Sequence, residues 1–390
     1  MEHQLVFLLE HYYLSIKMER IVYIDYLRNF ANLVRCFIHA SVPYMITDAP
    51  MWPVNDKGSW FFDFTIFELH LFVMELFFMI SGFMFAMELN NKSTRKIIKN
   101  RFKRIVIPFI FGLVLVVPIV LSMFTISNYS GLTLLQIDVL KHSYFSGWSL
   151  GFENFFPTAH LWFLYYLIIF YALTIFLRKI LLKIKFFSIV YLFAGIFVSI
   201  TCMFFMNRWI VDNPITLVPE PPSFIHYFCF FLIGFFVYKS EKLLLSLKTH
   251  ANKILMIGIV FGVFSIIPQL WFTKTDLPYY IYIKSLAIIL SCSAIYFLTI
   301  GIWGYFSKLQ VKDSKILRYL TDSSYWVYLS NMPFVVIFHI LFIPLDIPTY
   351  VKFIFSFIGA LTLSFLTYEF LVRYTFIGGI LNKRRFRNRK

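Results

Sequence analysis

Residues 23–44 read YIDYLRNFANLVRCFIHASVPY, a stretch long enough to cross a bilayer that also carries a stripe of polar side chains. The stripe consists of Asp25, Arg28, Asn32, Arg35 and His39, at spacings of 3, 4, 3 and 4. Because a helix turns by about 100° per residue, these spacings place all the members on one face. A charge inside a membrane costs at least about 2.5–3.5 kcal/mol and is tolerated when it faces a polar interior. The stretch therefore predicts a transmembrane helix that lines a hydrated or ligand-filled cavity.

The residue types in this stripe suggest two different roles, ligand binding by the arginines and proton transfer by the histidine. An anionic ligand that enters from the cytoplasm, such as the phosphates of an acyl-coenzyme A, would meet Arg28 and Arg35, whose guanidinium groups match phosphate geometry. His39, further along the stripe, would act as a general base. The alternative is that Asp25 neutralises Arg28 at the membrane surface and His39 only forms a hydrogen bond between helices.

The rest of the chain has the composition of a membrane protein. Of its 390 residues 59% are hydrophobic and 14% are charged, whereas soluble domains have about 25% charged residues. Apolar blocks of spanning length run at about 21–44, 61–88, 105–125, 159–177, 186–206, 223–238, 254–272, 280–306, 324–345 and 350–372. We therefore predict an all-α, polytopic integral membrane protein with about ten transmembrane helices.

The net charge of +16 does not form one basic patch, so a nucleic-acid partner is not expected. The loops at 89–104, 178–185, 239–253 and 307–318, together with the tail at 383–390, hold 25 of the 36 Lys and Arg residues. These segments alternate with connections that hold few positive charges. The positive-inside rule then places both termini in the cytoplasm, as in a multi-pass protein of the inner (plasma) membrane, with membrane lipids around it.

The second block contains further polar residues. Glu68 and Glu75 are seven residues apart, which on a continuous helix would place them on one face and extend the polar interior. The pair Ser81 and Gly82 predicts a close contact between helix backbones. We expect Glu75 to belong to the same polar cavity as the stripe.

Two later segments add candidate site residues. The run RKIIKNRFKRIVIP carries Arg101 and Arg104 at i, i+3, where both would point the same way at the mouth of the third helix and could hold a phosphate. His160 and Trp162 open the fourth block at its outer end, where a tryptophan often serves only as an interfacial anchor. The cysteines lie in apolar segments without metal-type spacing, so neither a disulfide nor a metal site is predicted.

These segments together resemble the acyltransferase 3 family of membrane acyltransferases. Arg28 followed by ten residues and His39 resembles the family's signature, and MELFFMISGF at 74–83, RFKRIVIP at 101–108 and AHLWFLYYL at 159–167 are similar to its later motifs, in the same order. The ending YEFLVRYTFIGGIL at 368–381 is similar to the subgroup that includes the glucan biosynthesis protein C type, which is associated with succinylation of periplasmic glucans. The resemblance covers about residues 20–381.

The resemblance implies a ten-helix core, a cytoplasmic acyl-coenzyme A donor and a sugar acceptor modified on the far side of the membrane. It implies that His39 and Arg28 are catalytic and that Arg101 and Arg104 bind the donor. We place Arg35 with the donor-binding residues. One departure stands in the ninth block, where family members often show a histidine and this chain has Asn331. That departure implies a different handling of the acceptor.

We therefore expect three segments: an N-terminal extension at 1–19, a membrane acyltransferase domain at 20–376 and a basic cytoplasmic tail at 377–390. The outer connection at about 126–158 is either a cap over the outer face or a simple connector. The predicted function is transfer of an acetyl or succinyl group from acyl-coenzyme A to a hydroxyl of a carbohydrate or glycolipid, without a metal. The alternative is a transporter or flippase for an anion or a lipid-linked sugar, because charges inside the membrane also mark transport pathways.

Overall fold

The computed structural model describes residues 21–47, 52, 56–127, 158–184, 189–206, 211, 213–214, 216–269, 276–342 and 344–381, and this part of the chain is helical and contains no strand. The predicted N-terminal extension, nearly all of the 126–158 connection and most of the basic tail lie outside the described residues.

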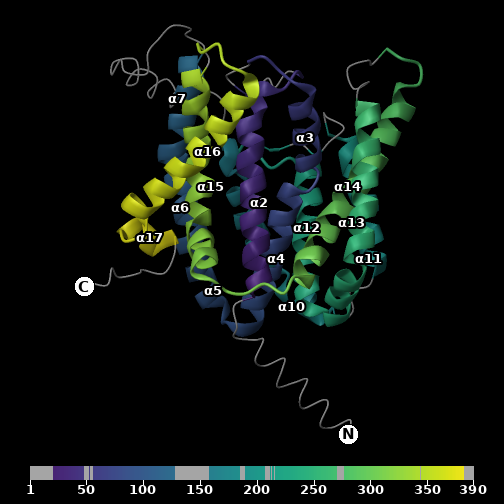
Figure 1. The fold of residues 1–390 in the computed structure, drawn as a ribbon. Coiled ribbons are helices and arrows are strands. Elements are labelled where there is room, and N and C mark those ends of the chain that lie inside the picture. The colour runs from purple at the N-terminus through teal and green to yellow at the C-terminus, as the bar shows by residue number, and fades with distance from the viewer. Residues whose placement is uncertain are drawn as a thin grey trace.

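The helices follow one another along the chain (Figure 1). They are α2 (Val22–Ser41), η1 (Val42–Tyr44), α3 (Trp60–His70), α4 (Val73–Asn91), α5 (Thr94–Arg101), the π-helix η2 (Phe102–Val106), α6 (Ile107–Phe111), the π-helix η3 (Gly112–Val116), α7 (Val117–Ser127), η4 (Ala159–Leu161), α9 (Trp162–Phe176), α10 (Arg178–Lys183), α11 (Ile189–Phe204), α12 (Pro221–Lys239), α13 (Glu241–Gln269), α14 (Tyr280–Lys308), α15 (Lys315–Phe342), α16 (Thr349–Thr367), the π-helix η5 (Tyr368–Val372) and α17 (Phe376–Leu381).

Each of the ten predicted blocks contains a helix. Among the described residues, eight helical stretches are long and apolar enough to cross a membrane. The other two blocks are α2, which carries three charged residues, and α11, which is 16 residues long. The prediction of an all-helical, polytopic membrane protein is confirmed.

The basic segments predicted as loops are all partly helical. The short helices α5 and α10 lie within 89–104 and 178–185. In 239–253 and 307–318, α13 already begins at Glu241 and α15 at Lys315. Hydropathy cannot detect these charged first turns, since they extend the helices beyond the apolar part. The second block is not one helix either, because α3 ends at His70 and α4 starts at Val73.

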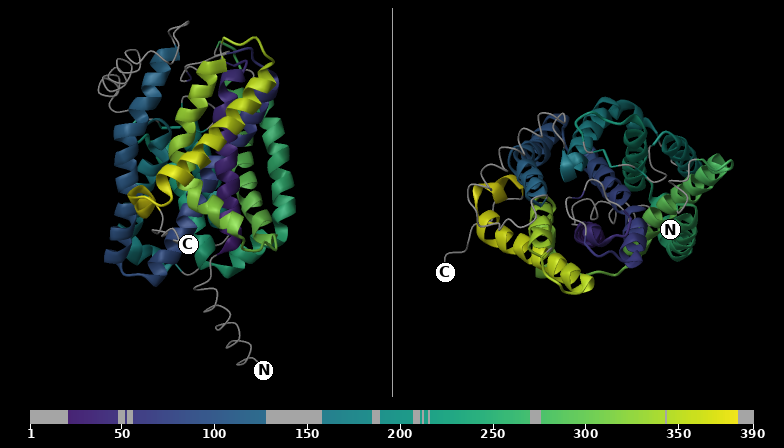
Figure 2. Two further views of the ribbon diagram at one scale, coloured as in Figure 1. Left: turned by 60° about the vertical axis from the view of Figure 1, so that its left-hand side comes forward. Right: turned by 90° about the horizontal axis from the view of Figure 1, so that it is seen from above.

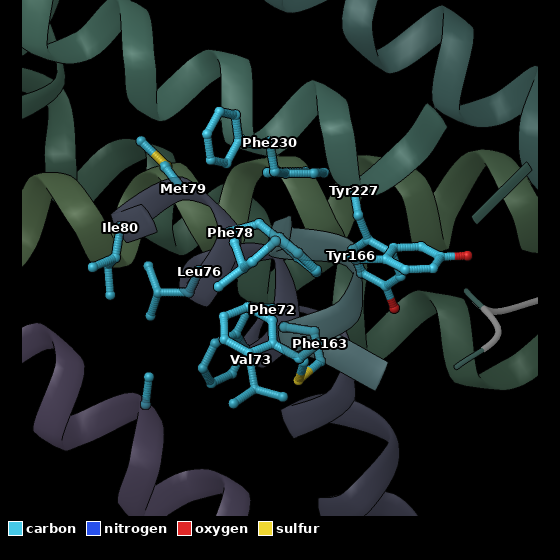
Figure 3. Packing of buried hydrophobic residues seen from close by; sticks show 14 of the residues in the cluster. Phe72, Val73, Leu76, Phe78, Met79, Ile80, Phe163, Tyr166, Tyr227 and Phe230 are labelled. Carbon is cyan, nitrogen blue, oxygen red and sulfur yellow. The ribbon is translucent and has the colours of Figure 1, made fainter. Parts of the chain in front are cut away.

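Aromatic side chains fill the interior between α4, α9 and α12 (Figure 3). The ring of Phe78 lies 4.8 Å from that of Phe163 and 4.9 Å from that of Tyr227, in tilted arrangements that suit the ring quadrupoles. The α4–α12 contact is also close at the backbone, since a Cβ atom on Gly82 would lie 1.8 Å from the carbonyl oxygen of Phe231. The predicted packing role of Gly82 is therefore confirmed.

The helix α2 lies in the middle of the bundle in Figure 1, and Figure 2 shows the surrounding helices nearly end-on. It packs in parallel against α15 at a constant offset. Asn29 donates to Thr321 at 3.1 Å, Asn32 to the carbonyl of Ser324 at 3.4 Å and Arg35 to the carbonyl of Val327 at 3.4 Å, and each pair is 292 residues apart. This register places the polar stripe of α2 against α15 inside the protein.

A candidate active site inside the bundle

A small cavity of about 60 Å³ lies beside the last turns of α2. Its walls come from α2, from the junction of α3 and α4, from the start of α9, from α15 and from the outer connection before α12. The lining residues are Arg35, Ile38, His39, His70, Val73, Met74, His160, Trp162, Asn213 and Tyr328. Such a volume exceeds what one water needs, so the cavity can hold water or a small group of a substrate.

The interruption of the second block forms one wall. Phe72 has φ −141° and ψ −18°, outside the helical region, so the chain breaks its hydrogen-bond ladder between α3 and α4. His70 at the end of α3 and Val73 and Met74 at the start of α4 then line the cavity. The break also separates Glu68 from Glu75, so the face that they were predicted to share does not exist.

His160 enters the cavity through an unusual turn. Ala159 adopts a φ of 45°, a conformation that costs a non-glycine residue about 1–3 kcal/mol and that often occurs at functional sites. His160 Nε2 lies 3.3 Å from the carbonyl oxygen of Leu329. That oxygen lacks its usual helical donor, because Pro333 has no N–H to offer four residues later. His160 therefore carries its proton on Nε2, and its buried Nδ1 has no partner among the described residues.

Arg35 is a buried cation at the cavity wall. Arg35 is only 4% exposed. Its guanidinium lies 4.9 Å from the ring centre of Tyr328, and Nη2 donates to Asn32 Oδ1 at 3.0 Å. Nε and Nη1 have no hydrogen-bond partner, and no acidic side chain pairs with Arg35 in the described part of the chain. An uncompensated buried cation attracts an anionic group.

His39 lies in the last turn of α2, next to this cation. Its Nδ1 is buried and has no hydrogen-bond partner within the described ranges. The ring centre of Trp52 lies 6.2 Å away, and Trp52 Nε1 donates to Nδ1 of His339 at 3.3 Å. The other nitrogen of His339 donates to the carbonyl of Ala40 at 3.3 Å, so His339 ties α15 to the end of α2.

The first residues of the stripe have a different role in this structure. Arg28 donates to Asp25 at 2.9 Å, and neither residue belongs to the lining of the cavity. Asp25 and Asn32 are buried as predicted, at 5% and 8% exposure. The pairing expected as the alternative for Asp25 and Arg28 is thus present, about three to four turns before His39 on α2.

The two arginines before the third block do not share one environment. Arg101 turns inward, pairs with Glu88 at 2.7 Å and lies 4.6 Å from the ring centre of Tyr171. Arg104 is exposed. The π-helix η2 begins directly after Arg101 and widens the turn, so the common direction expected from an i, i+3 spacing is not formed.

Glu75 does not line the cavity. It forms a fully buried pair with His226 of α12, whose Nε2 lies 3.2 Å from Glu75 Oε1. By contrast, His160 and Trp162 do line the cavity, and Trp162 is 5% exposed, so it is not an interfacial anchor. His70, a polar residue of the second block that was expected to be buried with Glu68 and Glu75, also lines the cavity, whereas sequence reasoning missed Asn213 and Tyr328. A single polar or aromatic residue at a helix end gives no periodic signal.

A protein-family model described as an acyltransferase domain matches residues 21–369, nearly the whole chain and all of the elements that line the cavity. No curated protein and no solved structure matches the chain.

Proposed function

The chain belongs to this acyltransferase family, and from that premise we propose that it moves an acetyl or succinyl group from cytoplasmic acyl-coenzyme A to a hydroxyl of a carbohydrate or glycolipid at the outer face of the membrane. The protein is a multi-pass membrane acyltransferase. The identities of the donor and acceptor, the direction of transfer and the location in the inner (plasma) membrane are parts of the proposal.

One observation carries the assignment of the site: His39 lines the same cavity as Arg35, a buried cation that has no acidic partner among the described residues. A histidine can take a proton from a hydroxyl, and a buried guanidinium can stabilise the negative charge that then develops on the thioester oxygen. The two groups lie one helical turn apart on α2, so a single helix fixes their relative placement.

The proposed reaction uses these groups in order. The acceptor oxygen attacks the carbonyl carbon of the thioester while Nε2 of His39 takes the hydroxyl proton. Arg35 stabilises the oxyanion of the tetrahedral intermediate. The C–S bond then breaks, the coenzyme A thiolate takes the proton from His39, and the acceptor leaves as an O-acyl ester.

The donor would approach from the end of the bundle at which the Lys- and Arg-rich connections lie. The α4–α5, α12–α13 and α14–α15 connections are together at the lower end in Figure 1, which the positive-inside rule assigns to the cytoplasm. Arg28 and the exposed Arg104 are nearer to this end than His39 is, and we propose that they contact the phosphates of the donor. His39 is in the last turn of α2, at the opposite end, which favours an acceptor on the outer side.

The experiment compares purified wild-type protein with His39→Ala in detergent or nanodiscs. Coenzyme A release is followed after addition of acetyl- or succinyl-coenzyme A and a glycan acceptor, and mass spectrometry identifies the acylated product. His39→Ala is expected to lose transfer by at least about 100-fold, as for removal of a general base.

His250→Ala serves as the matched control, because His250 is an exposed histidine on α13 far along the chain from the cavity residues. Its activity should equal that of the wild type. Retained transfer in a folded His39→Ala protein would reject His39 as the base. Movement of a substrate across the membrane without coenzyme A release would instead favour transport.

A further inference from the structure

Asn331 is a buried polar residue for which the fold provides no partner. It lies inside α15 with 0% exposure, and neither Oδ1 nor Nδ2 of its amide forms a hydrogen bond with the described residues. A buried amide without partners costs about 1–3 kcal/mol, so an apolar residue of similar size would stabilise the helix more. A side chain kept at such a cost points to a role other than packing.

The register between α2 and α15 places Asn331 at His39. The contacts of residues 29, 32 and 35 with residues 321, 324 and 327 all have an offset of 292, and the same offset assigns residue 331 to residue 39. At about 100° per residue, His39 falls between Asn32 and Arg35 around the axis of α2. By the same rotation, Asn331 falls between Ser324 and Val327 around the axis of α15. His39 and Asn331 therefore lie on the faces of α2 and α15 that contact each other.

The two helices are also held together beyond this level. The hydrogen bond from His339 to the carbonyl of Ala40 ties α15 to the residue that follows His39. Hydrogen bonds therefore join α2 and α15 on both sides of this level. The bond from Arg35 to Val327 lies before it along the helices, and the bond from His339 to Ala40 lies after it. Among the described residues, Nδ1 of His39 and both amide atoms of Asn331 have no hydrogen-bond partner. The register assigns the two residues to the same level of the α2–α15 contact.

We propose that Asn331 is the positioning residue of His39: when substrate occupies the cavity, Oδ1 of Asn331 accepts a hydrogen bond from Nδ1–H of His39. This bond fixes the imidazole in the tautomer whose Nε2 is free to take the acceptor's proton. The inference rests on the proposed function, in which His39 is the general base. Of the other cavity histidines, His70 bonds to the carbonyl of Ile66, and His160 donates through Nε2 to Leu329. Nδ1 of His160 is a second candidate acceptor, and the Asn331 variants distinguish it from Asn331.

The test measures activity and stability on the same variants. Asn331→Leu removes the acceptor oxygen and is expected to lower kcat for coenzyme A release by about 10- to 100-fold with little change in KM for the donor, as for other residues that orient a catalytic histidine. Because it removes unpaired buried polar atoms, its thermal unfolding midpoint should be equal to or above that of the wild type. A packing role predicts the opposite combination, a lower midpoint with an unchanged kcat per folded molecule.

Asn331→Asp keeps an acceptor oxygen at the same place and is expected to keep kcat within about threefold of the wild type. Ser323→Ala is the matched control, since Ser323 is equally buried on α15 but its hydroxyl already donates to the carbonyl of Leu320. If the leucine variant fails to accumulate, Asn331→Ala removes the same oxygen without added bulk.

The outcomes separate this inference from the proposed function. Wild-type protein that releases no coenzyme A with any donor rejects the proposed function itself. Wild-type activity combined with an unchanged kcat in Asn331→Leu overturns only the positioning role. An Asn331→Asp protein as slow as the leucine variant also overturns it, because the acceptor oxygen would then not be the group that matters.

Discussion

At the scale of single residues, several buried polar atoms have no partner among the described residues, and four of them belong to the cavity-lining side chains Arg35, His39 and His160. Nε and Nη1 of Arg35, Nδ1 of His39, Nδ1 of His160 and both amide atoms of Asn331 lack hydrogen-bond partners in the described part of the protein. Folding alone gives no reason to retain them, because each buried unpaired group is unfavourable. Under the proposed function, a substrate in the cavity completes the interactions of Arg35, His39 and His160.

Arg101 and Arg104 look equivalent in the sequence but differ in exposure and pairing, so their substitutions should have different effects. Because Arg104 is exposed, Arg104→Gln is expected to raise KM for acyl-coenzyme A about fivefold, the loss of roughly 1 kcal/mol from one phosphate contact, without changing the thermal midpoint. Arg101→Gln removes the guanidinium from the Glu88 carboxylate, which then keeps only Lys92 and Asn100 among the described residues, so it should destabilise the protein by about 1–2 kcal/mol. Coenzyme A release and thermal unfolding in detergent measure the two effects, and an unchanged KM in Arg104→Gln would count against donor binding there.

At the scale of elements, two helix contacts determine the shape of the site. The α2–α15 register brings the polar stripe against a single partner helix, and the α4–α12 contact holds the broken second block in place. Membrane helices gain nothing from hydrophobic exclusion between them, so close backbone packing at small residues is what fixes such contacts. Gly82 and Gly234 both provide it, because a Cβ atom on either would lie 1.8 Å from a backbone oxygen of the facing helix.

Gly82→Ala should therefore destabilise the protein by about 3 kcal/mol, because neither backbone can retreat without moving the aromatic core. Thermal unfolding and the monodisperse fraction in detergent report the loss. Gly112→Ala is the control: its Cβ would meet only the end of the Leu161 side chain, at 2.5 Å, and a leucine terminus can rotate away. Equal losses in the two variants would show that the backbone contact between α4 and α12 has no special importance.

At the scale of the whole molecule, charge distribution and connectivity agree. The connections rich in Lys and Arg lie at one end of the bundle, and the connections that contain Lys57 and Asp346 lie at the other (Figure 1). At that second end Lys352 pairs with Asp56 at 2.6 Å, which ties the start of α16 to the segment before α3. This asymmetry supports the proposed orientation with a cytoplasmic donor side.

The orientation can be tested by labelling with a membrane-impermeant maleimide. Lys57 and Asp346 have side chains 83% and 97% exposed, so Lys57→Cys and Asp346→Cys should react in intact cells. The exposed position 312 is at the opposite end, and Lys312→Cys should react only after permeabilisation. Wild-type protein gives the baseline, since three of its four cysteines are buried. Labelling of Lys312→Cys in intact cells would reverse the proposed topology.

The sequence by itself determined the helical membrane class, the placement of the ten apolar blocks and the burial of Asp25, Asn32 and Arg35. These features follow from hydropathy over about 20 residues and from the helical repeat, and both are local properties of the chain. The packing role of Gly82 could also be predicted from the sequence, because a small residue inside an apolar helix usually allows another helix to approach closely.

Only the tertiary structure decided which polar groups meet. Glu75 pairs with a histidine 151 residues away, Arg101 turns to Glu88, and Arg35 donates to the carbonyl of Val327 across 292 residues. No local pattern encodes these pairings, because they depend on which helices become neighbours and on their register. The same holds for the break between α3 and α4, which neither glycine nor proline marks in the sequence.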